Sequence, residues 1–303
     1  MNALVFGFGS IGMRHARILD ELGCDVAVLS RRAIDHPKHY RDLDEALNAH
    51  APNHVVVANA THEHHGALER LASAGYRGSV LVEKPLFDHS RPVPPNEFDH
   101  VNVAYNLRFH PLLRRMKDLL ESRRILSVQA YAGQYLPEWR PATDYRTCYS
   151  ADVQRGGGVL RDLSHELDYL GWLTGSWTSV SARGGHFSSL EISSDDVFAL
   201  LMSTERCPVV SVQINYLDRK GRRELVVNCD DTTIAVDLVR NEIQVGRHVE
   251  TVDVPRDATY RLMHQALLAG DTGTVCTLQG GIDTMSLIDA ATVSAQQNIL
   301  VYR

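Results

Sequence analysis

Two segments of the chain carry side chains that could transfer a proton at neutral pH. Lys84 follows a short apolar run, Ser79–Val82. In the second segment, three consecutive glycines precede Asp162, and His165 and Glu166 lie three and four residues after Asp162. That spacing places both carboxylates and the imidazole on one side of a helix. A carboxylate can orient an imidazole and raise its basicity, and a partly desolvated lysine can exchange a proton. Both segments could therefore supply a general acid or base.

Both segments also have a structural interpretation. Lys84 could be a surface lysine at a strand end, paired with Glu83. Asp162 and Glu166 could complement the dipole in the first turn of an ordinary helix, and taken alone the helix favours this interpretation. For Lys84, residue types and spacing leave both interpretations open.

The elements that would position these residues begin with a phosphate-binding turn. A strand, Ala3–Phe6, runs into the sequence GFGSIG and a helical pattern, and a second apolar strand, Val26–Leu29, follows. Gly7 permits the tight turn, Gly9 lets the backbone approach a pyrophosphate, and Gly12 lets the helix pack closely on the strand. The helix N-terminus adds unpaired N–H groups and a positive dipole. This βαβ unit is predicted to bind a dinucleotide through Gly7, Gly9, Ser10, Ile11 and Gly12.

The residues after the second strand bear on which dinucleotide is bound. NAD sites usually place Asp or Glu there to accept hydrogen bonds from the ribose hydroxyls, whereas this chain has Ser30, Arg31 and Arg32. A guanidinium offers a planar fork of donors that suits the 2′-phosphate of NADP. One arginine could instead stack on adenine while the other is solvated. NADP is therefore predicted, and NAD stays the alternative.

Composition argues against several other classes of protein. The 303 residues are 44% hydrophobic and 22% charged, which is enough to bury a sizeable core. The net charge of −6 disfavours nucleic acid or an anionic membrane as a partner. Five widely spaced cysteines without a C-x-x-C pair favour a reducing compartment, so we expect a cytoplasmic protein. The run His62–His65 lacks the three or four convergent ligands of a metal site, and no metal is predicted.

The order of the apolar runs predicts an α/β chain with two domains. Short buried strands at 54–58, 79–82 and 101–104 continue a parallel, doubly wound sheet, with a Pro-rich loop in place of a helix before the last of them. After Tyr105, strands follow one another closely, which indicates an open, mostly antiparallel sheet. We predict a dinucleotide-binding domain over residues 1–105 and a substrate-binding and oligomerisation α/β domain over residues 106–303. The predicted strands of the second domain are Ser127–Tyr131, Val197–Ser203, Val209–Tyr216, Glu224–Asn228 and Thr232–Leu238, and its helices are Pro111–Arg123, Val159–Leu173, Arg256–Leu268 and Gly281–Gln297.

Several motifs together resemble those of the Gfo/Idh/MocA oxidoreductases. They are GFGSIG, Asn59–His64, the tripeptide Glu83-Lys84-Pro85, Asn106–Phe109 and the triple-glycine helix, in the family's order and spacing over nearly the whole chain. The resemblance implies a Rossmann domain, NAD(P)-dependent oxidation or reduction of a sugar or cyclitol hydroxyl, and a C-terminal sheet that commonly forms the oligomer interface. A sheet covered on one face only would expose apolar residues in a monomer, so we expect a homodimer or homotetramer.

The resemblance also assigns roles to residues. Lys84 would be the proton-relaying lysine and His165 the catalytic histidine, while Asn59, His64 and Glu83 would lie along the cofactor.

The glycine helix departs from the family in one respect. Family members usually have three residues between its Asp and its His, whereas two separate Asp162 from His165. Counted forward from the glycines, Asp162 keeps its place and Glu166 takes that of the histidine; counted backward from Asp168, His165 keeps its place and Arg161 takes that of the aspartate. We favour His165, with Asp162 as its candidate partner, because an imidazole serves proton transfer better at neutral pH than an unshifted carboxylate.

A segment before the glycine helix, Tyr135–Ser150, mixes aromatic residues, arginines and hydroxyls. Such residues can stack on a sugar face and pair with a phosphate or carboxylate. The segment is similar to those of family members encoded among surface-polysaccharide genes, which implies an amino or deoxy sugar or a nucleotide-linked one. A surface loop with a few anchoring aromatics is the alternative. The candidate substrate-binding residues are Arg108, Arg140, Tyr145, Arg146, Tyr149, Arg161 and His165.

The sequence therefore predicts an NADP- or NAD-dependent enzyme that transfers hydride to or from a ring hydroxyl or ketone of a sugar derivative. Two other functions would use the same nucleotide site. One is a non-catalytic NAD(P)-binding sensor, against which intact Lys84 and His165 argue. The other is a glycosidase that cycles a retained NAD.

Overall fold

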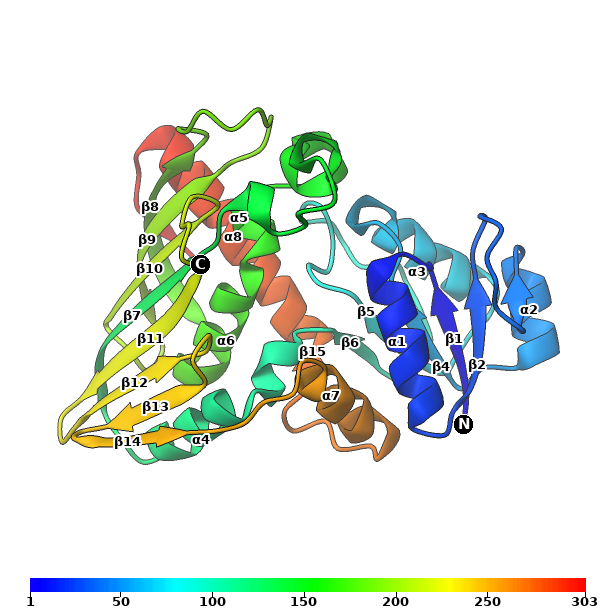
Figure 1. Cartoon of the computed structure of the whole chain (residues 1–303), viewed down its shortest axis with the longest axis horizontal. Helices are drawn as coiled ribbons and strands as arrows, with labels where there is room; N and C mark the ends of the chain where they lie inside the picture. The colour runs from blue at the N-terminus through cyan, green and yellow to red at the C-terminus, as the bar shows by residue number, and fades with distance from the viewer. The chain divides into compact units, whose positions relative to one another are not determined.

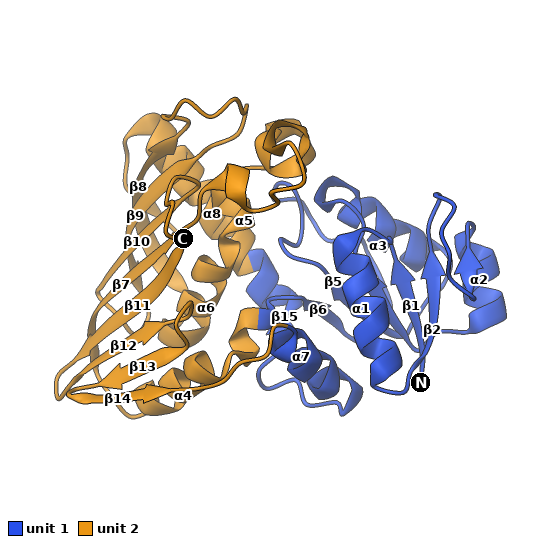
Figure 2. Cartoon of the chain, in the orientation of Figure 1, with its two compact units in different colours: residues 1–106, 257–282 blue, residues 107–256, 283–303 orange.

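The computed structural model describes residues 1–303, which form two compact units (Figures 1 and 2). The first comprises residues 1–106 and 257–282, and the second comprises residues 107–256 and 283–303. The division predicted at residue 105 therefore needs a correction, because segment 257–282 returns to the first unit. It returns because its short strand β15 pairs with β6 and its helix α7 packs against α1.

The first unit is built on a seven-stranded sheet in the order β15-β6-β5-β4-β1-β2-β3. Every pair is parallel except β15 with β6. The central strands are buried along nearly their whole length, which explains their continuous apolar runs. The predicted doubly wound parallel sheet is confirmed. Its strands are β1 Asn2–Phe6, β2 Asp25–Leu29, β3 His39–Tyr40, β4 His54–Val57, β5 Ser79–Val82, β6 Val101–Val103 and β15 Cys276–Thr277.

Helices flank this sheet (Figure 1). No helix forms between β5 and β6, where the Pro-rich loop was predicted. The helix after β4 begins at His64, and a short 3₁₀ turn, Thr61–Glu63, precedes it. The helices of the unit are α1 Ser10–Glu21, α2 Leu43–His50, α3 His64–Ser73 and α7 Ala258–Leu268, together with the first residues of α8 Leu278–Gln297.

The second unit contains a nine-stranded sheet in the order β14-β13-β12-β11-β7-β10-β9-β8-β16. All neighbours are antiparallel except β7 and β10. This confirms the predicted mostly antiparallel sheet and adds strands that the sequence did not indicate. The strands are β7 Ile125–Gly133, β8 Trp177–Gly185, β9 Val197–Thr204, β10 Val209–Asn215, β11 Arg222–Cys229, β12 Thr233–Asp237, β13 Glu242–Val245, β14 His248–Thr251 and β16 Val301–Tyr302.

Helices cover one face of the nine-stranded sheet (Figure 1). They are α4 Pro111–Leu120, α5 Val159–Asp162, α6 Ser164–Thr174 and the rest of α8. The single helix predicted over 159–173 is in fact two, because the backbone at Leu163 leaves the helical region with φ −98° and ψ 27°. Tertiary bonds fix the carboxylates on either side of the break, Asp162 to Tyr216 and Glu166 to Arg223.

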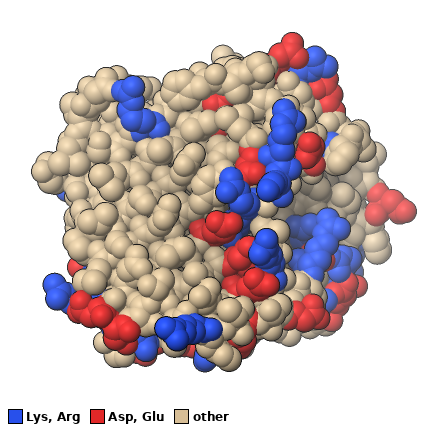
Figure 3. Space-filling model, turned by 60° about the vertical axis from the view of Figure 1, so that its left-hand side comes forward, with Lys and Arg blue, Asp and Glu red and all other residues tan.

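The opposite face of this sheet has few charged residues. Alternation along β9 buries Leu200 and Met202 and leaves Leu201 56% exposed, and Val209 on β10 is exposed as well. Figure 3 turns this side of the molecule forward and shows a broad area without Lys, Arg, Asp or Glu. None of the helices is long and apolar enough to cross a membrane.

Candidate functional site

The glycine turn in the first unit has the geometry of a phosphate cradle. Gly7 has φ +106°, and a Cβ there would lie 2.5 Å from the backbone nitrogen of Asn59. A Cβ at Gly12 would collide with the carbonyl of Gly7, so this glycine is needed for close packing of α1 on β1. Gly9, in contrast, has nothing within 4 Å of an added Cβ. The backbone at Gly9 is therefore open to an approaching group, as expected for a pyrophosphate-binding turn.

The N-terminus of α1 also fits a phosphate. Gly9 is its N-cap, no side chain caps its N–H groups, and no carboxylate lies in its first turn, which contains Ser10 and Ile11. A buried oxygen beside the turn, Oδ1 of Asn59 at the end of β4, has no hydrogen-bond partner. Uncapped N–H groups and an orphaned amide oxygen are what a bound dinucleotide would satisfy.

The arginines after β2 lie beside this turn. Arg32 donates to the carbonyl of Phe8, within the glycine sequence, at 3.1 Å. Arg31 is 83% exposed and forms an ion pair with Glu63 at 2.8 Å. Ser30 is buried, and its hydroxyl accepts from the backbone N–H of Arg32. Both guanidinium groups are thus near the place where the adenosine ribose of a Rossmann dinucleotide lies.

His64 joins the ends of β4 and β5. It is buried, with Nδ1 close to the carbonyls of Pro85 and Leu86 at 3.2 and 3.1 Å and Nε2 3.3 Å from the carbonyl of Asn59. Burial lowers the pKa of His64, which favours the neutral ring. A neutral ring donates from one nitrogen only, so His64 hydrogen-bonds to the carbonyls on one of its two sides and lies close to the other, and it shapes the loops of the edge where a cofactor would lie.

The other members of the histidine run point apart. Glu63 pairs with Arg31, and His65 lies against Phe87 and the carbonyl of Pro92. No group of three or more His, Cys, Asp or Glu side chains in the structure could hold a metal ion.

The Glu83-Lys84-Pro85 tripeptide follows β5, at the edge of the sheet that also carries the glycine turn. Glu83 is 6% exposed and accepts hydrogen bonds from Nε2 of His15 at 2.7 Å and from the backbone N–H of Lys84 at 3.0 Å. Burial raises the pKa of Glu83, but the hydrogen bonds from His15 and from the Lys84 backbone, together with the neighbouring positive charge, leave the pKa below its ordinary value. The peptide bond between Lys84 and Pro85 is cis. Glu83 is therefore a buried carboxylate that holds the backbone of Lys84.

In the second unit, two of the three consecutive glycines allow close packing within the chain. Gly158 has φ +123°, and a Cβ on it would collide with the carboxylate of Asp195, while one on Gly157 would collide with the carbonyl of Tyr149. Asp195 in turn accepts from the backbone N–H of Leu160 at 3.1 Å. The close approach that these glycines permit is therefore to neighbouring parts of the chain.

Asp162 is buried beneath two tyrosines. Tyr216 donates to its carboxylate at 2.6 Å. Burial, followed by the charge of Asp162, raises the pKa of Tyr216 and of Tyr149 well above the ordinary value, which keeps both phenols protonated. One hydrogen-bond partner of Asp162 is thus a tyrosine, which the sequence reasoning missed, since Tyr216 follows β10 and lies far away along the chain.

His165 and Glu166 differ in their surroundings. His165 is half-buried, whereas Glu166 is fully buried and forms an ion pair with Nε of Arg223 at 2.7 Å. The Glu166 carboxylate also lies 3.5 Å from the hydroxyl of Tyr169. Glu166 thus has the surroundings of a structural ion pair. Arg161 is half-buried and acts electrostatically on Asp195.

The candidate substrate arginines have diverse surroundings. Arg108 is buried and donates through Nε and Nη2 to the Asp168 carboxylate at 2.9 and 2.7 Å, so the fork that we assigned to a substrate binds another side chain of the unit. Arg146 is exposed and pairs with Asp144 and Glu191. Arg140 is exposed.

The segment over 135–150 is a series of short 3₁₀ turns: Leu136–Glu138, Tyr145–Thr147 and one that begins at Tyr149. The Tyr145 hydroxyl accepts from the backbone N–H of Glu191 at 3.2 Å. The Trp139 ring packs edge to face on Tyr216 with 5.2 Å between centroids. The aromatic side chains of Tyr145 and Trp139 therefore anchor this segment, and Trp139 lies next to Tyr216, the tyrosine that bonds to Asp162.

Comparisons with known proteins agree with this architecture. Residues 113–235 match the family model for the GFO/IDH/MocA C-terminal domain. Among solved structures, levoglucosan dehydrogenase in complex with NADH and levoglucosan superposes with a TM-score of 0.84 at 17% identity, over 100% of this chain and 99% of that one. GenD2 from gentamicin A biosynthesis, in complex with NAD, superposes with a TM-score of 0.81 at 19% identity, over 100% of this chain and 96% of that one. The WlbA dehydrogenase from Bordetella pertussis, in complex with NADH and UDP-GlcNAcA, superposes with a TM-score of 0.79 at 18% identity, over 100% of this chain and 97% of that one.

A search of curated protein sequences gives no significant match. The structural likeness covers whole chains, and at these identities it establishes the fold. The resemblance inferred from the motifs agrees with this match: the second unit contains a GFO/IDH/MocA C-terminal domain over residues 113–235, and the first unit has a Rossmann-type parallel sheet.

Proposed function

We propose that this chain is an NAD(P)-dependent oxidoreductase that transfers hydride to or from a ring hydroxyl or ketone of a sugar derivative. The observation that carries the proposal is the open turn at Gly9, with uncapped N–H groups of α1, at the edge where β5 delivers Lys84. Ligands of doubly wound sheets bind at the carboxyl ends of the strands. A dinucleotide on this turn would therefore lie along the edge that carries Lys84.

The similar structures support the coarse assignment. Those compared above are described as bound to NAD or NADH, one with levoglucosan and one with UDP-GlcNAcA. A carbohydrate or nucleotide-linked sugar is therefore the class of substrate that we propose for this chain.

The cofactor would be held by backbone at Gly7, Gly9, Ser10, Ile11 and Gly12, and by Ser30, Arg31, Arg32 and Asn59, with His64 and Glu83 fixing the loops beside it. When bound, the nicotinamide ring supplies the hydride acceptor or donor. Lys84 and His165 would take the hydroxyl proton as the carbon–hydrogen bond breaks and return it in the reverse direction. Asp162, bonded to Tyr216, would position the segment that carries His165. Arg140, Tyr145, Arg146, Tyr149 and Arg161 remain our candidates for substrate contacts.

A panel of sugars and nucleotide sugars, assayed by nicotinamide absorbance with both cofactors, tests this function. We expect turnover with at least one sugar bearing a free ring hydroxyl. Cofactor binding without any net absorbance change would favour the sensor, and glycoside cleavage with retained cofactor would favour the glycosidase.

The choice of cofactor gives a separate prediction. If Arg31 or Arg32 grips a 2′-phosphate, the double substitution Arg31→Ala/Arg32→Ala should weaken NADP by about 1.5–3 kcal/mol per lost contact and barely change NAD. Arg77→Ala, which removes an exposed guanidinium paired with Glu97 in the same unit, is the control. Calorimetric titration measures both affinities. Tighter binding of NAD than of NADP to the unsubstituted protein would contradict the prediction.

The nine-stranded sheet gives a prediction about assembly. Its uncovered face, with exposed Leu201 and Val209, is the surface through which we propose a homodimer or homotetramer. Leu201→Arg should place a desolvated charge in that interface and shift the protein to monomer, while Phe187→Arg, at another exposed apolar residue, should not. Light scattering at micromolar concentration decides, and a monomeric unsubstituted protein would refute the assembly.

A further inference from the structure

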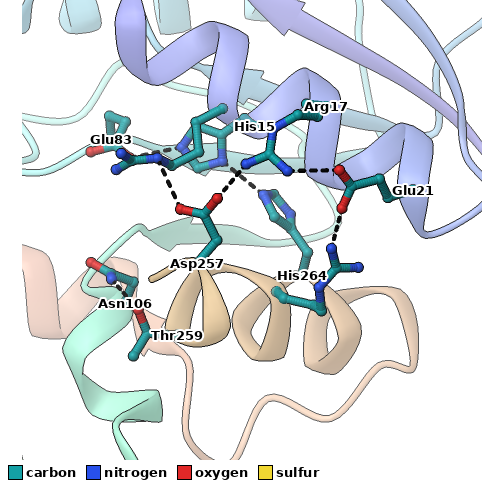
Figure 4. A network of polar contacts seen from close by, with 10 residues as sticks. His15, Arg17, Glu21, Glu83, Asn106, Asp257, Thr259 and His264 are labelled. Carbon is teal, nitrogen blue, oxygen red and sulfur yellow. Dashed lines mark hydrogen bonds and ion pairs between the residues drawn. The ribbon is translucent and has the colours of Figure 1, made fainter. Parts of the chain in front are cut away.

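Three buried polar side chains in the first unit, those of Glu83, His15 and His264, form a connected series that begins next to Lys84. Nε2 of His15 lies 2.7 Å from a carboxylate oxygen of Glu83, and Nδ1 of His15 lies 2.7 Å from Nε2 of His264 (Figure 4). Both histidines are fully buried, with 0% of their surface exposed. The rings of His15 and His264 are perpendicular, with 5.0 Å between centroids.

The three members come from distant parts of the sequence. His15 lies on α1 one turn after the glycine sequence, Glu83 follows β5, and His264 lies on α7 in the returning segment. An ion pair of Asp257 with Arg17 joins the start of α7 to α1 (Figure 4), and Asp257 forms a second ion pair with Arg14. The fold thus brings His264 into the interior of the first unit, where its burial needs an explanation beyond apolar packing.

The contacts among Glu83, His15 and His264 are compatible with two protonation states that differ by one proton. Glu83 is an acceptor, so His15 donates to it through Nε2–H. With His15 neutral, its Nδ1 is bare and His264 must donate through Nε2–H. With one proton more, Nδ1–H of His15 donates to a bare Nε2 of His264, whose proton is then on Nδ1. The shared proton moves along one short hydrogen bond, the new proton enters at Nδ1 of His264, and both states satisfy the same contacts.

The entry point of that proton is unusual. Nδ1 of His264 is buried without a hydrogen-bond partner, and so is Nε2 of the neighbouring His54, whose ring centroid lies 6.3 Å away. The other nitrogen of His54 binds the hydroxyl of Ser79 at 2.8 Å. Burial lowers the pKa of His264 well below its ordinary value and that of His54 to about 4. His15 is the ring that lies beside a carboxylate, with Nε2 at 2.7 Å from Glu83, and this contact is where an added positive charge would be stabilised.

The remaining groups around His15 are few. From α7, Tyr260 packs edge to face on its ring with 5.5 Å between centroids, and Asp257 pairs with Arg14. Arg14, from α1, lies over the Tyr260 ring. Burial raises the pKa of Tyr260 above the range in which it could titrate with the histidines. At the end of β5, Lys84 acts electrostatically on Glu83.

We propose that Glu83, His15 and His264 form a buried proton-sharing chain, in which one added proton is held on His15, switches the tautomer of His264 and reduces the negative charge that Glu83 presents to Lys84. His15 and His264 are thus positioning residues for the lysine. When His15 is neutral, the full negative charge of Glu83 favours the charged form of Lys84. When His15 carries the added proton, that negative charge is partly cancelled and Lys84 releases a proton more easily. The consequence for catalysis rests on the proposed function of Lys84, whereas the tautomer switch does not.

Nitrogen NMR of protein labelled with ¹⁵N-histidine tests the chain directly, since ring shifts distinguish protonated from bare nitrogens. We expect His264 to change from Nε2–H to Nδ1–H as the pH is lowered within the folded range. His50 is a control in the same spectrum, because it is buried and its Nε2 binds only backbone carbonyls, of Ala3 and Asp25, so it should keep one tautomer. Glu83→Gln should move the switch of His264 to lower pH by about one pH unit or more. A His264 that keeps one tautomer throughout would overturn the proposal.

Kinetics test the consequence for Lys84. His264→Phe removes the partner of Nδ1 on His15, so proton uptake should need a lower pH and the acidic limb of the kcat/KM profile should move down by about one pH unit. His264→Gln, whose amide can donate or accept, should restore most of the profile, and His50→Gln should leave it unchanged. A profile unmoved in His264→Phe would refute the coupling. If no sugar is turned over, the NMR result still tests proton sharing among Glu83, His15 and His264. If turnover is found but His264 keeps one tautomer, the proposed function stands and the proposed proton sharing is refuted.

Discussion

Lys84→Ala and His165→Ala should each lower kcat by about 10²–10⁴-fold, the range that general acid–base groups contribute. Neither residue belongs to the Gly7–Gly12 turn, so the dissociation constants of NAD and NADP should change by about threefold or less. Because residues of one relay act as a unit, the loss in the double variant should be much smaller than the product of the two single losses. Steady-state kinetics with the best sugar, together with cofactor titration, measures both quantities.

Glu166→Gln is the matched control for this prediction, since it also decides between the two alignments of the glycine helix. Glu166 is fully buried and paired with Arg223, so its loss should lower stability and leave kcat nearly unchanged if His165 is the base. A severe loss of kcat in Glu166→Gln with a mild effect of His165→Ala would instead place Glu166 in the histidine's role. Near-normal turnover in both His165→Ala and Lys84→Ala would leave the oxidoreductase proposal without an acid–base pair.

Much of the fold could be predicted because local patterns and packing agree. The strand Ser79–Val82 has the same bounds in the structure as in the prediction, since its four apolar or small residues are bounded by turn residues and nearly all are buried. Strands at the edges of the sheets, or next to an edge strand, were missed. Trp177–Gly185 is rich in Ser, Thr and Gly, and Cys276–Thr277 and Val301–Tyr302 are two residues long, so neither composition nor alternation marks them.

The returning segment shows a limit of a different kind. The helix near 256–268 was predicted, but its assignment to the second domain was not correct, because the contacts that place it are with α1. His15 and His264 are 249 residues apart in sequence. A pattern read along the chain cannot show that two distant histidines share a proton, and only the tertiary fold brings them together.

The candidate site was predictable where backbone geometry decides. Gly7 and Gly12 have the roles that the glycine sequence implied, since a Cβ on either would collide with backbone. The sequence of three glycines does not show what they contact, and only the fold places Asp195 and Tyr149 beside Gly158 and Gly157. Polar side chains were hardest to assign, since the sequence does not show which partner satisfies a buried charge. Arg108, which we expected to bind substrate, is the clearest example.

Arg108→Ala should therefore act on stability. Its guanidinium makes two hydrogen bonds with the Asp168 carboxylate, both groups are largely buried, and the loss of one partner leaves the other as an uncompensated buried charge. Breaking such a pair typically costs about 3–5 kcal/mol, so we expect a decrease of that size in the free energy of unfolding, measured in urea. Arg146→Ala, which breaks an exposed ion pair of the same type with Asp144, should leave the unfolding midpoint unchanged.

A second variant separates a structural role of Arg108 from substrate binding. Arg108→Met combined with Asp168→Leu replaces both charges by apolar side chains and should recover most of the lost stability, because neither charge is then left buried alone. If the role is structural, this double variant should also recover kcat/KM. If Arg108 contacts the substrate, the double variant should fold well and still show a raised KM, since the guanidinium that binds the sugar would be absent. If the double variant regains both the free energy of unfolding and the KM of the unsubstituted protein, Arg108 is removed from the substrate site and assigned to the core of the second unit.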